Sequence, residues 1–213
     1  MVDTHPKAIY IIGPSCTGKT TLLNALLEYY AQAEDSKLST RPLAAIREVA
    51  RSVMREQDFD RSDITSSADR SLKFQKAILQ AQYKAETVLK SETWYISDRS
   101  GIDPVVYARS FIGEEAAEEL LVSPEWTELE HRMRASLVFL CEAGGDWLAD
   151  DGTRLMPKDL EAWVRFDHAY RQLLRERKIE YHLIPKDFTK TAARVTLVTT
   201  AYQQLLDSMY TCG

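Results

Sequence analysis

The stretch YIIGPSCTGKTT (residues 10–21) combines two glycines, a lysine and two threonines directly after an apolar run. The pattern GxxxxGKT begins at Gly13 and ends at Thr20, and it is that of a loop that cradles nucleotide phosphates between a strand and a helix. The backbone N–H groups of such a loop form an anion-binding concavity, and the helix N-terminus adds partial positive charge. We therefore predict that the loop holds ATP through Gly13, Pro14, Ser15, Cys16, Thr17, Gly18, Lys19, Thr20 and Thr21.

The last residues of the motif have distinct predicted roles. Lys19 would reach the β and γ phosphates, and the hydroxyl of Thr20 would help to hold Mg²⁺. The alternative is a chance glycine-rich turn before a helix, which the agreement of strand, spacing and helix disfavours. The chain has no Asn-Lys-x-Asp guanine reader, and its nearest segment, IPKDFT, is not one. We therefore favour ATP over GTP.

The segment WYISDRSGIDP places Asp98 and Arg99 at the end of an apolar strand. Ligands of an α/β sheet bind at the carboxyl ends of its strands, so Asp98 would reach Mg²⁺ directly or through water. ATP-driven machines usually carry a water-activating glutamate after this aspartate, whereas this chain has Arg99. An arginine beside the phosphates suits transfer to a bound acceptor, so Arg99 would hold the acceptor or the transferring phosphate. A plain surface ion pair is the alternative. Asp103 would either bind substrate or cap the next helix.

The segment IREVAR (residues 46–51) is predicted to contribute the acceptor side. If a short strand ends near Arg47, Glu48 projects over the same crevice and could accept a proton from a substrate hydroxyl. Arg51 and Arg55 lie four residues apart on the helix that would follow, where they could bind an acceptor as one cationic stripe. A solvated helix face is the alternative, and we favour it for Arg55.

The segment DWLADDGTRLMP (residues 146–157) mixes acidic residues, a glycine and Arg154. We predict a lid at about residues 144–158 that carries Arg154 to the transferring phosphate, where it would exclude water and stabilise developing charge. The alternative is an ordinary acidic loop with one ion pair. The catalytic set predicted from the sequence is therefore Lys19, Glu48, Asp98, Arg99 and Arg154, and the predicted substrate-binding set is Glu48, Arg51, Arg99 and Asp103.

The composition narrows the classes of ligand and compartment. With 213 residues, 45% of them hydrophobic, we expect one domain over residues 1–213. The net charge of −5 gives no broad cationic field, which favours a small phosphorylated ligand over a nucleic acid polymer. Three distant cysteines, no secretory signal and no apolar run long enough for a membrane span indicate a cytoplasmic protein. The oligomeric state stays open, a homodimer included.

Alternating apolar segments must position these residues. Hydrophobic periodicity predicts strands at Ala8–Ile12, 42–46, Trp94–Ser97, Ser136–Cys141 and Glu180–Ile184. It predicts helices at Lys19–Gln32, Ala68–Leu89, 102–110, 114–133, 158–178 and 189–208. The alternation indicates an α/β fold of the P-loop kinase type, with about five parallel strands covered on both faces by helices and a small lid.

Several of these segments together resemble a known family. The loop from Gly13 to Thr20, REVAR, FQKAILQAQYKAE, SDRSGIDPVVY and DDGTR are similar to the AAA-type domain shared with NadR-type ribosylnicotinamide kinases. The likeness spans about residues 8–185. The DRS segment also resembles the Glu-Arg-Ser of deoxynucleoside kinases and the Asp-Arg of thymidylate kinases. These resemblances imply a magnesium-side Asp98, a phosphate-binding Arg99 and an acceptor-side Glu48.

The sequence thus favours transfer of the γ-phosphoryl group of Mg·ATP to a hydroxyl of a small, nucleoside-like acceptor. One alternative is a nucleoside monophosphate kinase, in which Arg51 and Arg109 would bind the phosphate of the acceptor. Another is a nucleotide-binding regulatory switch that has no acceptor.

Overall fold

The computed structural model describes residues 8–32, 42–60, 67–90, 93–144 and 159–211. Five strands form one parallel sheet in the order β2-β3-β1-β4-β5. Their bounds are β1 Ala8–Ile12, β2 Leu43–Ile46, β3 Trp94–Asp98, β4 Leu137–Cys141 and β5 His182–Ile184. The predicted parallel α/β sheet of the P-loop kinase type is confirmed.

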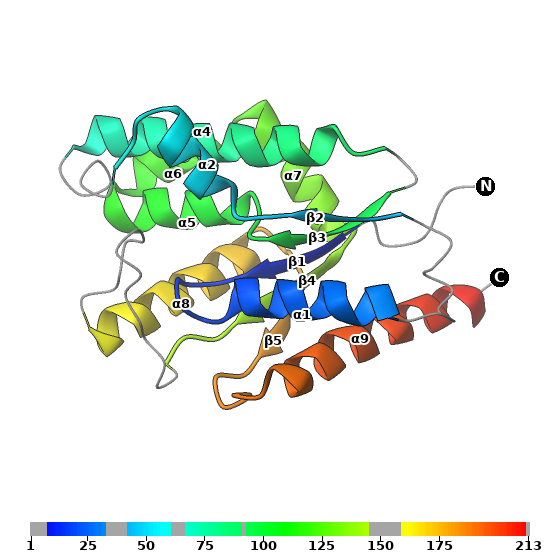
Figure 1. Cartoon of the computed structure of the whole chain (residues 1–213). Coiled ribbons are helices and arrows are strands. Elements are labelled where there is room, and N and C mark those ends of the chain that lie inside the picture. The colour runs from blue at the N-terminus through cyan, green and yellow to red at the C-terminus, as the bar shows by residue number, and fades with distance from the viewer. Residues whose placement is uncertain (1–7, 33–41, 61–66, 91–92, 145–158, 212–213) are drawn as a thin grey trace.

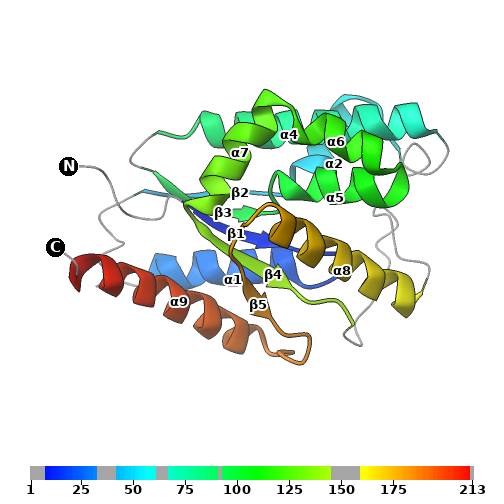
Figure 2. The ribbon, with the colours of Figure 1, turned by 180° about the vertical axis from the view of Figure 1, so that it is seen from behind.

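Helices cover both faces of this sheet (Figures 1 and 2). Helices α1 and α9 lie on one face, and α4, α5, α6, α7 and α8 lie on the other. Helix α2 follows β2 and packs on α4. The bounds are α1 Lys19–Gln32, α2 Val49–Glu56, α4 Ala68–Thr87, α5 Ile102–Phe111, α6 Glu114–Leu121, α7 Pro124–Arg134, α8 Leu160–Glu176 and α9 Thr191–Thr211.

Alternation along the central strand divides the core into two layers. Ile9 and Ile11 of β1 face Leu22 and Leu26 of α1, whereas Tyr10 lies in the layer that contains α4, α5, α7 and α8. Every residue of β1 is buried. A continuous apolar run is what a parallel strand covered on both faces requires, because neither face meets water.

The prediction of one helix at 114–133 is wrong, because the structure has two helices there, α6 and α7. Helix α6 ends at Leu121, and Ser123 caps α7 by accepting a 3.2 Å hydrogen bond from the Trp126 N–H. Pro124 stands in the first turn of α7, where its missing N–H costs nothing. Within the described residues, no helix is both long and apolar enough to cross a bilayer.

Candidate functional site

Three carboxyl ends of strands meet at one edge of the sheet. The loop at 13–18 leaves β1, Asp98 ends β3, and Glu48 lies two residues beyond β2. Strand β3 lies between β1 and β2, and Asp98 pairs in register with Ile11. The strand order therefore brings the three predicted motifs together, although about 30 to 50 residues separate each from the next.

The loop after β1 depends on its two glycines. Gly13 has φ +130°, and a Cβ there would lie 2.6 Å from the Cys141 carbonyl oxygen of β4. Gly18 has φ +84°, a backbone conformation that residues other than glycine rarely adopt. Cys16 also has a positive φ of +62°. Alternating backbone conformations of this kind form anion-binding concavities.

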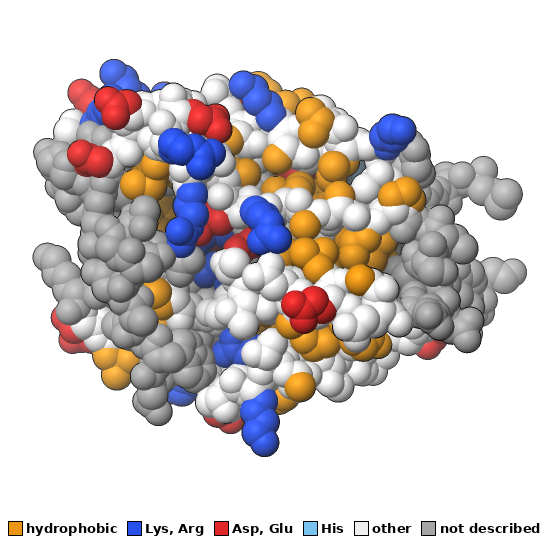
Figure 3. Space-filling view, viewed as in Figure 1, with side chains coloured by type: hydrophobic (Ala, Val, Ile, Leu, Met, Phe, Trp, Pro, Cys, Tyr) orange, Lys and Arg blue, Asp and Glu red, His pale blue; other side chains and the backbone are white. Residues whose placement is uncertain are grey.

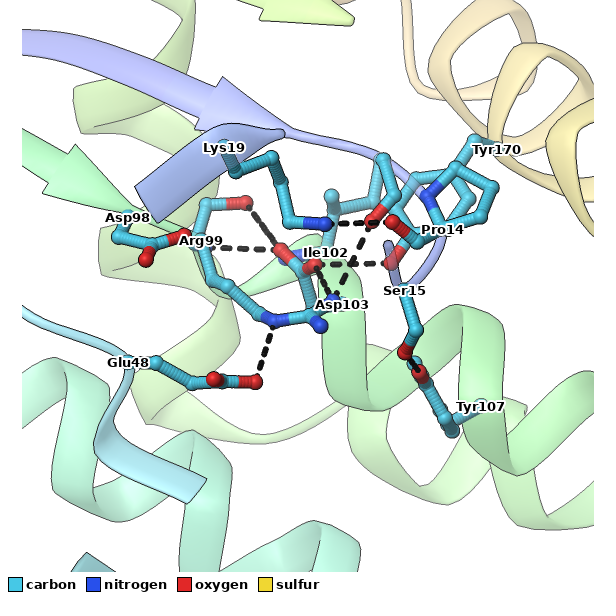
Figure 4. Close-up of polar contacts among 12 residues, drawn as sticks. Pro14, Ser15, Lys19, Glu48, Asp98, Arg99, Ile102, Asp103, Tyr107 and Tyr170 are labelled. Carbon is cyan, nitrogen blue, oxygen red and sulfur yellow. Dashed lines mark hydrogen bonds and ion pairs between the residues drawn. The ribbon is translucent and has the colours of Figure 1, made fainter. Parts of the chain in front are cut away.

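Lys19 begins α1 with its ammonium group buried against the loop. Its Nζ donates to the Pro14 carbonyl at 2.5 Å and lies 3.4 Å from Thr17 Oγ1 (Figure 4). Burial, followed by repulsion from Arg99, lowers the pKa of Lys19 to about 8, although Asp98 opposes the shift. Among the described residues, no carboxylate lies within ion-pair distance of Nζ. A buried cation of this kind is suited to an anionic ligand.

Thr20 and Asp98 form a hydroxyl–carboxylate pair beside the lysine. Thr20 Oγ1 donates to Asp98 Oδ2 at 2.5 Å, and Asp98 is buried. One hydroxyl and one carboxylate fit Mg²⁺, which prefers oxygen ligands and usually takes the rest from phosphates and water. In the part of the chain described, no group of three or more His, Cys, Asp or Glu side chains could hold a metal by itself.

Arg99 is buried and contacts protein groups on several sides. Its Nε donates to Glu48 Oε1 at 2.9 Å, and its Nη1 donates to Asp103 Oδ1 at 3.0 Å and to the Gly13 carbonyl at 3.2 Å (Figure 4). Burial alone would lower the pKa of Arg99, but the charge of Glu48 in particular raises it well above the ordinary value. Arg99 has φ +88°, so backbone strain is held at this position. Arg99 therefore fixes Glu48 relative to the phosphate loop.

Asp103 makes the contacts of a turn residue. Its carboxylate accepts from the backbone N–H and the hydroxyl of Ser100, at 2.8 and 3.2 Å, and from the Tyr170 hydroxyl at 2.8 Å. Asp103 also pairs with Arg99 and is not among the residues that line the cavity described below. These contacts fit the helix-start role that the sequence left as an alternative to substrate binding.

Glu48 lies between two guanidinium groups. Its Oε1 accepts from Arg99, and its Oε2 accepts from Arg51 Nε at 3.1 Å. The prediction that Arg109 could share acceptor binding with Arg51 stays a prediction; in the structure Arg109 pairs with Glu114 at 2.7 Å and Glu176 at 2.6 Å and does not line the cavity described below. Those ion pairs join α5, α6 and α8.

A cavity of about 110 Å³ lies at the centre of these contacts, lined by Cys16, Gly18, Lys19, Thr20, Thr21, Glu48, Asp98 and Arg99. Basic and acidic side chains gather on the face of the molecule that carries α2 and the start of α1 (Figure 3). A complete small-molecule site usually has about 300–1,000 Å³, so this cavity matches phosphates and not a whole nucleotide. A larger cavity, of about 330 Å³, lies beside Thr93 and Ser136 at the amino ends of β3 and β4, and none of the residues that line the phosphate-loop cavity lines it. Arg154 and residues 145–158 of the predicted lid lie outside the described residues.

Three side chains that the sequence analysis did not select contact the phosphate loop. Trp163 Nε1 donates to the Ser15 carbonyl at 2.9 Å, and the Tyr107 hydroxyl lies 3.0 Å from Ser15 Oγ. Arg194 Nη1 donates to the Thr17 carbonyl at 2.6 Å. These residues lie 92 to 177 positions away along the chain. No local pattern marks them, so only the tertiary structure could identify them.

Comparisons with known proteins agree with this fold. A family model described as an AAA domain matches residues 8–191. No curated protein matches the chain in sequence. A solved structure of NadR protein in complex with NAD and AMP-PNP is similar, with a TM-score of 0.63 and 16% identity, and the match covers 92% of this chain and 49% of that one.

Two further structures are similar. NadR protein in complex with NR has a TM-score of 0.59 and 19% identity, covering 83% of this chain and 45% of the other. A thymidylate kinase from Ehrlichia chaffeensis has a TM-score of 0.58 and 14% identity, covering 94% and 99%. The chain spans about half the length of the NadR chains that it matches. At these identities the likeness shows the fold.

Proposed function

We propose that the chain, which belongs to the AAA domain family, transfers the γ-phosphoryl group of Mg·ATP to a hydroxyl of a small acceptor. The observation that carries the proposal is the buried Lys19 ammonium, which lies in a phosphate-loop cavity that Asp98, Arg99 and Glu48 also line. An anion-binding loop and an acceptor-side carboxylate on one cavity are what phosphoryl transfer requires.

The donor side would use the motif residues. The loop N–H groups and Lys19 would hold the β and γ phosphates, and Thr20 and Asp98 would hold Mg²⁺. When bound, Mg²⁺ supplies positive charge that offsets the charge of the transferring group. Lys19 now donates to the Pro14 carbonyl, so it would exchange this contact for phosphate oxygens.

The acceptor side would use Glu48. The acceptor oxygen would form a bond to the γ phosphorus while the bond from that phosphorus to the β–γ bridging oxygen breaks, releasing ADP. We assign the proton of the hydroxyl to the Glu48 carboxylate, which Arg99 and Arg51 hold at the cavity. Asp98 is the alternative base, but its Oδ2 already accepts from Thr20.

We propose a nucleoside-like acceptor. A NadR protein in complex with NR has a similar fold, which supports this acceptor class. The thymidylate kinase of similar fold is named for a nucleoside monophosphate and supports the alternative class. We favour the nucleoside because Arg109, one of the two arginines that would bind the phosphate of a monophosphate acceptor, is already paired with Glu114 and Glu176.

The test is acceptor-dependent ADP formation with Mg·ATP across nucleosides, nucleoside monophosphates, sugars and amino alcohols. Lys19→Ala serves as the blank, and Lys84→Ala, which removes an exposed lysine of α4, is the matched control. We expect stimulation by a nucleoside in the wild type and the control and none in the blank. Stimulation by a monophosphate alone would assign the enzyme to the other acceptor class. ATP binding without any stimulation would leave a nucleotide-dependent switch.

The same assay tests Glu48. Glu48→Gln should bind Mg·ATP nearly as the wild type does and lose about 10²-fold in the transfer rate, the usual scale for a general base. The control is Glu56→Gln, which changes an exposed carboxylate at the end of α2, the helix that begins after Glu48, and this variant should retain the rate. An unchanged rate in Glu48→Gln would move the proton to another group.

A further inference from the structure

The carbonyl groups of Pro14, Ser15 and Thr17 in the phosphate loop each accept a hydrogen bond from a side chain. Lys19 donates to Pro14, Trp163 donates to Ser15, and Arg194 donates to Thr17. The first donor belongs to the motif, whereas the other two come from α8 and α9. The two outside donors approach from opposite faces of the sheet.

Peptide geometry turns these bonds into a constraint on the N–H groups. In a planar trans peptide, the carbonyl of one residue points opposite to the N–H of the next. A bond that fixes the Ser15 carbonyl therefore also fixes the direction of the Cys16 N–H. In the same way, a bond to the Thr17 carbonyl fixes the Gly18 N–H. When these carbonyls are held outward by the protein, their partner N–H groups are left to face the cavity, which Cys16 and Gly18 line.

The two outside donors are well placed to hold the loop. Trp163 is 1% exposed and Arg194 is 5% exposed, so water competes little for their hydrogen bonds. Arg194 also donates through Nε to the Phe188 carbonyl at 2.6 Å, which fixes its guanidinium group. A Cβ on Gly18 would lie 2.8 Å from Arg194 Nη1. The requirement for glycine at 18 thus includes the close approach of Arg194.

Lys19 cannot hold the loop carbonyl groups in both the ligand-free and the bound protein. Nucleotide phosphates would draw the Lys19 ammonium away from the Pro14 carbonyl, whereas Trp163 and Arg194 contact the loop without lining the cavity. Their bonds can therefore persist in the ligand-free and the bound protein.

We propose that Trp163 and Arg194 are positioning residues that hold the phosphate loop in its anion-binding form before the nucleotide arrives. The inference rests on the proposed function, because it takes nucleotide phosphates as the ligand. Its energetic basis is preorganisation, since a loop that is already ordered loses less conformational entropy when it binds.

The first experiment removes one donor with little change of shape. Trp163→Phe keeps a buried aromatic ring and loses the N–H. Trp126→Phe is the matched control, because Trp126 is also fully buried and its Nε1 has no hydrogen-bond partner in the described part of the chain. Calorimetry with Mg·AMP-PNP and with inorganic tripolyphosphate should show about fivefold weaker binding of both in Trp163→Phe, the scale of one hydrogen bond. Trp126→Phe should stay within twofold of the wild type.

The second experiment treats the arginine in the same way. Arg194→Lys keeps the charge and loses the planar fork that reaches two carbonyl groups. Arg134→Lys is the control, because Arg134 also donates to a backbone carbonyl, that of Arg177, far from the site. We expect about fivefold to tenfold weaker binding of both probes for Arg194→Lys. The control should retain the wild-type affinity.

A spectroscopic readout separates positioning from a general loss of packing. In the ligand-free protein, the backbone amide signal of Cys16 should shift or broaden in Trp163→Phe, and that of Gly18 should do so in Arg194→Lys. Both should return toward the wild-type positions at saturating Mg·AMP-PNP. Unchanged signals, or affinities equal to those of the controls, would overturn the inference. A wild-type protein that binds neither probe would instead refute the proposed function.

Discussion

Lys19 and Arg99 show what burial does to two cations of one cavity. Arg99 has two carboxylate partners, Glu48 and Asp103, and its pKa is raised by Glu48 in spite of desolvation. Lys19 has only neutral acceptors among the contacts described, and burial lowers its pKa to about 8. Lys19 therefore has more to gain than Arg99 from an anionic ligand, because Arg99 already has carboxylate partners.

The pKa of Lys19 predicts how nucleotide affinity depends on pH. Bound phosphate would raise that pKa, so above pH 8 the ligand-free protein must take up a proton to bind. Titration calorimetry with Mg·AMP-PNP should show affinity nearly constant up to about pH 8 and then falling toward about tenfold per pH unit. Lys19→Arg, whose guanidinium stays charged, should give a flat profile over the same range. A wild-type profile that stays flat to about pH 10 would show that Lys19 has its ordinary pKa of about 10.4.

The sequence identified the residues of the site better than their contacts. Cys16 and residues 18–21 of the loop line one cavity together with Glu48, Asp98 and Arg99, as their positions after predicted strands indicated. The sequence could not show that Arg99 is held by Asp103 and Glu48, since such pairing depends on the helix that follows each strand. Their catalytic roles stay predictions.

At the scale of helices and strands, hydrophobic periodicity predicted the elements better than the local residues predicted where a helix ends. The three central strands, β1, β3 and β4, were predictable because parallel strands buried on both faces must be continuously apolar. The edge strands β2 and β5 are only partly buried, and their apolar signal is shorter. The break between α6 and α7 was missed because Ser123-Pro124 lies inside an apolar pattern that has helical spacing on both sides. Pro124 is a residue that starts helices as readily as it ends them, and only the Ser123 cap shows which.

The capping role of Ser123 gives a prediction about α7. Ser123→Ala removes the acceptor of the Trp126 N–H and should lower the free energy of unfolding by about 1 kcal/mol. Chemical denaturation should show an earlier midpoint with an unchanged slope. Ser208→Ala, on the exposed side of α9, is the control and should change stability little. Affinity for Mg·AMP-PNP should stay at the wild-type value, and a weakened affinity would mean that α7 is coupled to the phosphate loop.

Across the whole molecule, ionisable groups occupy both ends of the sheet. The cavity lies at the carboxyl ends of the strands. Nearer their amino ends, Glu86 of α4 is buried and accepts hydrogen bonds of 2.8 Å from Tyr10 and Tyr95. Gln82 donates to Glu86 at 2.9 Å, and the guanidinium of Arg132 lies 3.6 Å away. None of these side chains lines the phosphate-loop cavity, so we expect their energetics to appear in the stability of the protein.

Glu86 predicts how the stability of the whole molecule depends on pH. Burial raises its pKa, although hydrogen bonds from Gln82, Tyr10 and Tyr95 oppose the shift. The folded state therefore holds a proton that the unfolded state has released, and stability should fall as pH rises from about 4.5 through the folded-state pKa. Glu86→Gln removes this titration, and the Oε1 of Gln82, buried without a partner among the described residues, can accept from the new amide. Denaturation at about pH 5 and about pH 8 should show a smaller loss of stability in Glu86→Gln than in the wild type. Parallel losses in the two proteins would mean that Glu86 ionises at the same pH in the folded and unfolded states.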